Sequence, residues 1–254
     1  MTAEAETLPA ATTGSSGPQP TTERPAAVLW DFDGTLVDSE PLWMRAQHDL
    51  IPQWGGEWSD EHAHQLVGNS LITSGEYIVR VLGRDDMTPE FVVDALVERV
   101  VAALRAGEIE WRPGARELLE ELHAAGVPCA LVSASYRRLL DAVLEVLPEG
   151  TFATVVAGDD VRHGKPHPEP YLTACTRLGV RPEETVVLED SIPGCASGSA
   201  AGAVVLGIHN MVDLPTGPRR VLLDTLHGVG VPELSAHYTS ARGETGPDVP
   251  GGPV

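Results

Sequence analysis

The chain has 254 residues, enough for one large α/β domain or for a core with an inserted domain. It carries 17 Lys and Arg against 37 Asp and Glu, and the net charge of −20 disfavours nucleic acids and anionic membranes as partners, since both are bound through basic surfaces. Any phosphate site must therefore be a local exception to a repulsive overall field.

Cysteine usage and the N-terminal sequence bear on the compartment. The three cysteines, Cys129, Cys175 and Cys195, have neither the number of a disulfide framework nor the spacing of a metal site. They suit a reducing environment. No signal peptide is visible, and no apolar run approaches transmembrane length. We therefore expect a soluble, cytoplasmic protein, either a monomer or a small homo-oligomer.

Hydrophobic periodicity divides the chain into an α/β core and one helical block. An apolar strand is predicted at 26–31, and from about 38 to 108 apolar residues recur at helical spacing. Strands and helices then alternate, which predicts a Rossmann-like, doubly wound parallel sheet. The expected organisation is a disordered tail at 1–24, an α/β core at 25–37 and 109–238, a helical cap at 38–108, and a second disordered tail at 239–254.

Local signals support individual elements of this scheme. Thr88 followed by Pro89 is typical of a helix start, with a capping hydroxyl and proline at the first helical position. Pro113 and Gly114 open a helix that Gly126 ends. The later strands are predicted at Val127–Val132, Thr154–Ala157, Val186–Leu188 and Ala203–Leu206.

Two acids, Asp31 and Asp33, lie at the end of the first predicted strand. In an extended segment their side chains point the same way, and two adjacent carboxylates repel unless a cation neutralises them or one holds a proton. Ligands of open α/β sheets bind at the carboxyl ends of the strands, where this pair would lie. Taken alone, the pair also fits a solvated turn.

Other strand ends carry further polar groups, namely Ser133, Lys165, Glu189 and Asp190. Each has an ordinary explanation alone: Ser133 as a helix cap, the acids as solvated loop residues. In a parallel sheet, however, all of them would meet at one edge. Carboxylate oxygens without His or Cys indicate Mg²⁺.

Lys165 is the only lysine of the chain, since arginine supplies the other 16 of the 17 basic residues. It lies in a Gly-Lys-Pro loop. A compact ammonium can contact a carboxylate and a phosphate oxygen together, whereas a planar guanidinium fits other geometries. This favours a role in the site.

The ordered set Asp31-Phe32-Asp33-Gly34-Thr35, Ser133, Lys165-Pro166 and Glu189-Asp190 resembles the four motifs of the haloacid dehalogenase (HAD) superfamily, over roughly residues 26–210. The helical block after the first motif resembles its small α-helical cap. The sequences around Asp38–Trp43, Lys165–Pro168 and Leu188–Ser191 are similar to the β-phosphoglucomutase-like branch, and within it to sugar and polyol phosphate phosphatases.

This resemblance implies a Mg²⁺-dependent phosphatase acting on a small phosphorylated metabolite through an aspartyl-phosphate. Asp31 would be the nucleophile and Asp33 the general acid and base. The resemblance also assigns the ligands: Mg²⁺ to Asp31, the backbone carbonyl of Asp33 and Asp190, with Glu189 in support, and the phosphoryl group to Ser133, the amide near Ala134, and Lys165.

The resemblance leaves alternatives open. Asp33 argues against a dehalogenase, which lacks that acid/base partner. A β-phosphoglucomutase-type mutase would carry a histidine where this chain has Trp43 and an arginine where Leu71 follows Gly68-Asn69-Ser70. A catalytically silent phosphate- or Mg²⁺-binding partner protein is the non-enzyme alternative. Residues expected to govern substrate choice are Trp43, Gly68, Asn69 and Ser70, with Arg45 and Arg80 also considered.

Overall fold

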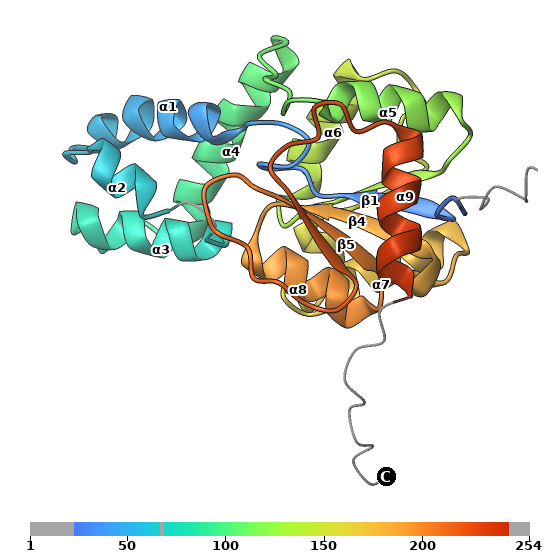
Figure 1. Cartoon of the computed structure of the whole chain (residues 1–254). Coiled ribbons are helices and arrows are strands. Elements are labelled where there is room, and N and C mark those ends of the chain that lie inside the picture. Colours follow the sequence, from blue (N-terminus) through green and yellow to red (C-terminus); the bar gives the residue numbers. More distant parts are fainter. Residues whose placement is uncertain (1–22, 67–68, 244–254) are drawn as a thin grey trace, which may run out of the picture.

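The computed structural model describes residues 23–66 and 69–243, which form a central sheet with helices on both faces and a group of helices at one side (Figure 1). All strand pairs are parallel, in the order β3-β2-β1-β4-β5-β6. The carboxyl end of β1 therefore lies between those of β2 and β4. The strands are β1 Ala27–Trp30, β2 Cys129–Val132, β3 Thr154–Val156, β4 Thr185–Glu189, β5 Val204–Ile208 and β6 Arg220–Leu223.

Both faces of the sheet are buried, which explains why its central strands are continuous apolar runs. In β1, Val28 and Trp30 pack in one hydrophobic cluster, whereas Ala27 and Leu29 pack in the other. Figure 1 shows α5 and α9 over the first face, and α7 and α8 over the second. The core helices are α5 Ala115–Ala124, α6 Arg137–Val146, α7 Glu169–Leu178, α8 Ile192–Ala201 and α9 Val231–Arg242.

A helical insert separates β1 from α5, as the sequence predicts. The Thr88 side chain accepts a hydrogen bond from the Phe91 N–H at 3.2 Å, so the predicted helix start is confirmed. The two connections to the core lie side by side, because the Asp38 N–H donates to the Glu110 carbonyl at 2.8 Å. The insert contains α1 Glu40–Leu50, α2 Asp60–His64, α3 Leu71–Leu82 and α4 Pro89–Arg105. The predicted fold class, a parallel α/β core with an inserted helical cap, is confirmed.

The structure differs from the prediction near the C-terminus. Strand β6 was not predicted, because it is four residues long and half-exposed at the sheet edge. The tail predicted from 239 begins too early: α9 continues to Arg242, since Tyr238 and Ala241 are buried in the core and Arg242 pairs with Glu23. Residues 1–22 of the first predicted tail and 244–254 of the second lie outside the described residues. Within the described ranges, no helix is both long and apolar enough to cross a membrane.

Candidate active site

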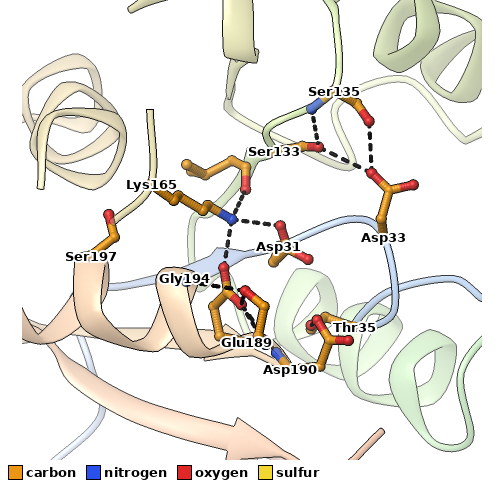
Figure 2. A network of polar contacts seen from close by, with 12 residues as sticks. Asp31, Asp33, Thr35, Ser133, Ser135, Lys165, Glu189, Asp190, Gly194 and Ser197 are labelled. Carbon is orange, nitrogen blue, oxygen red and sulfur yellow. Dashed lines mark hydrogen bonds and ion pairs between the residues drawn. The ribbon is translucent and has the colours of Figure 1, made fainter. Parts of the chain in front are cut away.

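The polar residues predicted to meet at the carboxyl edge of the sheet do so (Figure 2). Asp31 directly follows β1, Ser133 follows β2, and Glu189 ends β4 with Asp190 after it. Lys165 reaches them from the loop that precedes α7. The parallel register brings together groups that are up to 159 residues apart in the sequence, counting from Asp31 to Asp190. The cluster therefore lies at the strand ends, where the sequence places it.

Lys165 connects the two sides of this cluster. Its Nζ lies 2.5 Å from Asp31 Oδ1, 2.6 Å from Glu189 Oε1 and 3.0 Å from the Val132 carbonyl. The side chain is 7% exposed. Burial lowers the pKa of Lys165, but the adjacent carboxylates of Asp31 and Glu189 raise it further, so the pKa lies above its usual value and the ammonium stays charged.

Glu189 is fully buried and both of its carboxylate oxygens are occupied. Oε1 accepts from Lys165 and, at 2.9 Å, from the Tyr171 hydroxyl. Oε2 accepts from the Asp190 and Ser191 N–H groups at 3.1 Å and from the Ser191 hydroxyl at 2.9 Å. Gly194 makes room for this carboxylate, because a Cβ there would lie 1.7 Å from Oε1. Glu189 therefore orients Lys165 and the start of α8.

Asp190 is held from two sides. The Thr35 hydroxyl donates to Oδ1 at 3.1 Å, and the Asn210 amide donates to Oδ2 at 2.9 Å. Burial, followed by the charge of Glu189, raises the pKa of Asp190 to about 6. Burial is also the main reason that the pKa of Asp31 is raised well above its usual value.

Gly34 packs closely against the side chains of Asp190 and Asn210. Its φ is +86°, and a Cβ there would lie 2.1 Å from Asp190 Oδ2 and 2.7 Å from Asn210 Nδ2. Gly34→Ala should displace the Asp190 carboxylate and lower kcat by about 100-fold, since a shift of about 1 Å at reacting groups has that effect. Steady-state kinetics beside a thermal melt test this, and unchanged kcat in a folded variant would contradict it.

The carboxylates of Asp31, Glu189 and Asp190 offer oxygen atoms that all lie within 4.8 Å of one another. Among the described residues, Lys165 is the one cation in contact with these three carboxylates, so the buried cluster has two surplus negative charges when ionised. Oxygen donors with surplus negative charge suit a hard divalent cation. Asp31 and Asp190 line the cavity, so a metal ion bound by their carboxylates could also contact a molecule bound in the cavity.

Replacing Asp190 tests the cation site without measuring activity. In the metal-free protein the pKa of Asp190 is about 6 against a usual 3.8. The folded state therefore binds the Asp190 proton more tightly than the unfolded state does. The resulting contribution to the free energy of unfolding, on the order of 3 kcal/mol, is fully present below pH 3.8 and is lost as the pH rises through about 6.

Asp190→Asn should thus raise the melting temperature of the metal-free protein at neutral pH and have a much smaller effect at acidic pH. Mg²⁺ should raise the melting temperature of the wild type but not of the variant. Thermal denaturation with Mg²⁺ or with a chelator measures both effects, and equal Mg²⁺ stabilisation of the two proteins would contradict them.

Asp33 occupies a separate hydrogen-bonding site beside Asp31. Its Oδ2 accepts from Ser135 Oγ at 2.7 Å and from Ser133 Oγ at 3.4 Å, and its Oδ1 accepts from Ser39 Oγ at 2.5 Å. Figure 2 shows Asp33 turned toward Ser133 and Ser135, while Asp31 turns toward Lys165. The two acids of the first motif therefore have different surroundings.

A cavity of about 310 Å³ lies between the core and the insert, and both predicted catalytic acids line it. Of the residues expected to govern substrate choice, Trp43, Asn69 and Ser70 line it, whereas Gly68 lies outside the described residues. Arg45 and Arg80 do not belong to its lining: Arg45 pairs with Glu108, and Arg80 lies over the Tyr77 ring. Ala134 and Lys165 also line it.

Sequence reasoning missed four residues of the site. Ser39 and Ser135 contact Asp33, Asn210 contacts Asp190, and Tyr171 contacts Glu189. Two of them carried a usable signal: Ser135 belongs to the same strand-end turn as Ser133, and Asn210 follows the end of β5. Tyr171 is fully buried on α7, at helical spacing from the buried Ala174 and Cys175, and this apolar pattern gives no sign that its hydroxyl contacts Glu189.

A parallel α/β core with a helical insert, and a buried Asp–Lys–carboxylate cluster facing the cavity between them, define a capped hydrolase-type architecture. The chain belongs to the haloacid dehalogenase-like hydrolase family, whose model matches residues 28–208. The resemblance drawn from the four motifs is thereby confirmed.

Individual relatives agree with this membership. Hexitol phosphatase A of Escherichia coli is 33% identical over 193 residues, which covers 74% of this chain and 84% of that protein. A bifunctional riboflavin kinase/FMN phosphatase of Arabidopsis thaliana is 30% identical over 73% of this chain, which spans only 49% of that longer protein. The crystal structure of CbbY from Rhodobacter sphaeroides in complex with phosphate superposes with a TM-score of 0.72 at 29% identity, covering 83% of this chain and 99% of CbbY.

Proposed function

We propose that this protein is a Mg²⁺-dependent phosphatase that hydrolyses a small phosphate monoester of the sugar or polyol class. The observation that carries the proposal is that the two acids of the first motif have different partners. Asp31 contacts Lys165 and lies near Asp190, whereas Asp33 accepts hydrogen bonds from serine hydroxyl groups in the same cavity. Asp31 thus lies among charged groups, as a nucleophile next to a metal ion would, and Asp33 is free to donate and accept a proton. The E. coli relative, a hexitol phosphatase, supports the substrate class.

In the proposed reaction Asp31 attacks phosphorus, so that an O–P bond forms to its carboxylate as the ester P–O bond breaks. Asp33 gives its proton to the departing alkoxide, which leaves as an alcohol. Asp33 then takes a proton from water, whose oxygen attacks the phosphorus of the aspartyl-phosphate. Phosphate leaves, and Asp31 is regenerated.

The chain's own residues account for binding the phosphoryl group. Lys165 holds Asp31 in place and supplies positive charge, while Ser133 and the amide of Ala134 follow β2 at the same edge. Asp31, Asp190 and the backbone carbonyl of Asp33 would hold Mg²⁺, with Glu189 in support. When bound, Mg²⁺ offsets the repulsion between carboxylate and phosphate and stabilises the charge of the transition state.

The cavity lining supports a substrate with a single phosphate. Among the described residues of the lining, Lys165 is the one basic side chain, and it is paired with carboxylates. The stretches that the structure does not describe contain no Lys, Arg or His. The lining also includes Asp38, Glu40 and Gln47, whose side-chain oxygens can accept hydrogen bonds from hydroxyl groups. The two carboxylates would repel a second phosphate.

The cysteines support a cytoplasmic location for this activity. Cys129, Cys175 and Cys195 are buried free thiols, in keeping with a reducing compartment. Burial raises the pKa values of Cys129 and Cys195 to about 12, so both stay protonated and chemically quiet.

A substrate panel tests the proposal. Phosphate release should occur from hexitol or sugar monophosphates with Mg²⁺ and stop when a chelator removes the metal. The corresponding bisphosphates should have a kcat/KM at least about tenfold lower, since the described residues of the lining offer no basic side chain besides the carboxylate-paired Lys165 to receive a second phosphate. Metal-independent turnover would contradict the mechanism. Isomerisation of β-glucose 1-phosphate with a bisphosphate activator would instead favour the mutase alternative.

A further inference from the structure

A second group of metal-binding side chains lies outside the cavity, on the loop that leads into α7. His163 Nδ1 lies 2.8 Å from Glu169 Oε2, and His167 Nδ1 lies 3.9 Å from the same oxygen. The two imidazole rings are 4.7 Å apart between centroids. The three ligand atoms lie within 4.8 Å of one another, and none of these residues has a part in the proposed reaction.

The spacing of these atoms suits a tetrahedral ion. A Zn²⁺ ion with bonds of about 2.0–2.1 Å places neighbouring ligand atoms about 3.3 Å apart. The two distances to Glu169 Oε2, 2.8 and 3.9 Å, lie on either side of that value. To bind a metal, the ligand atoms would therefore need to move by about half an ångström. The metal would replace the hydrogen bond between His163 and Glu169 and the 3.2 Å hydrogen bond from the Glu169 N–H to His167 Nδ1.

The backbone around the three side chains is already fixed. Glu169 accepts from the Arg162 N–H at 2.9 Å and the His163 N–H at 3.2 Å. The His167 carbonyl accepts from Ser197 Oγ at 2.6 Å, and the His167 N–H donates to the Gly164 carbonyl at 3.0 Å. Because the loop is ordered before any ion arrives, little conformational entropy opposes binding.

We propose that His163, His167 and Glu169 bind a transition metal ion of the Zn²⁺ class. Two neutral imidazoles and one carboxylate favour such an ion over Mg²⁺, which prefers oxygen ligands. The side chains of His163 and His167 are 63% and 51% exposed, so water can fill the fourth position. The net charge of −20 favours the approach of any cation.

The position of this site gives it a structural consequence. The two histidines lie two residues before and two residues after Lys165, so a bound ion would cross-link the loop that carries the catalytic-site ammonium. Occupancy should therefore raise the thermal stability of the folded chain, because the ion binds the native loop and not the unfolded one.

Calorimetric titration of Zn²⁺ into the full-length protein, at neutral pH with millimolar Mg²⁺ to occupy the carboxylate cluster, tests the site. We expect one Zn²⁺ per chain with micromolar or tighter affinity. His163→Gln and His167→Gln should each weaken it by at least about tenfold and abolish the rise in melting temperature. His123→Gln, which changes an exposed histidine on α5, is the matched control.

Either of two results would overturn the proposal. One is that the wild type takes up no Zn²⁺ in this range, and the other is that both loop variants bind it as the wild type does. Melting curves of the metal-free variants show whether they are folded, so a loss of binding is not mistaken for a loss of structure. The outcome is independent of phosphatase activity, because no substrate is present.

Discussion

Asp31→Asn should lower kcat by at least about 10⁴-fold, because an amide does not attack phosphorus and cannot form the aspartyl-phosphate. The variant should remain folded. Lys165 keeps Glu189 as a partner at 2.6 Å, and burial disfavours the Asp31 charge that the substitution removes. The loss should appear in kcat with every monophosphate that the wild type hydrolyses, since the change removes the nucleophile and not a substrate contact.

Phosphate release under saturating substrate and Mg²⁺ measures this effect. Asp213→Asn is a suitable control, because Asp213 is an exposed aspartate on the loop after β5 and its loss should leave kcat unchanged. Retention of more than about one part in a hundred of the activity by a pure Asp31→Asn protein would be incompatible with covalent catalysis by Asp31.

Lys165→Met should destabilise the metal-free protein by about 3–5 kcal/mol, the usual result of leaving a buried charge without its partner. Lys165 is the ammonium that contacts both Asp31 and Glu189, and it is 7% exposed. The loss of stability in Lys165→Met should be smaller at acidic pH. The pKa of Asp31 is already raised by burial, and in the variant a proton can take the place of the ammonium.

Equilibrium denaturation in the presence of a chelator measures the stability loss. A second variant, Lys165→Met combined with Glu189→Gln, separates charge from packing. Removing the Glu189 charge should recover part of the lost stability, whereas a pure packing defect would make the double variant no better than the single one. A loss below about 1 kcal/mol for Lys165→Met would show that the cluster does not depend on its ammonium.

The cluster was predictable from sequence because strand topology, not detailed packing, brings it together. Asp31, Ser133 and Asp190 each follow an apolar run, and a parallel sheet aligns the ends of such runs. The role of Lys165 followed from chemistry, since a lone lysine in a loop is an unusual choice in an arginine-rich chain. The contacts to Asp31 and Glu189 agree with that reasoning.

The supporting residues were harder to predict, because their role depends on which way a loop side chain turns. Ser39 precedes α1 and reaches Asp33 across the junction of core and insert, although serine before a helix is usually a cap. Asn210 follows β5 and turns toward Asp190. Such polar loop residues are common on protein surfaces, and a position near a strand end, as for Asn210, does not by itself show which partner the side chain contacts.

The C-terminal elements were missed for a different reason. Strand β6 is short and half-exposed, so its sequence lacks the continuous apolar run of the central strands. Helix α9 buries Leu234, Tyr238 and Ala241, but polar residues lie between them and its amphipathic pattern is weak. In the insert, helical periodicity predicted helices yet did not reveal which side chains would line the cavity, because that depends on how the insert packs on the core.

The most direct test of the proposed mechanism is to look for the phosphorylated enzyme. Asp33→Asn should slow hydrolysis of the intermediate, because the base that activates water is lost, so that the variant accumulates phosphate on Asp31 when mixed with substrate and Mg²⁺. Rapid quenching followed by peptide mass spectrometry should find one phosphoryl group on the peptide that contains Asp31, and none in an Asp31→Asn protein. A phosphoryl group on another residue, or phosphate release in a single turnover with no phosphorylated enzyme in either the wild type or Asp33→Asn, would contradict the mechanism.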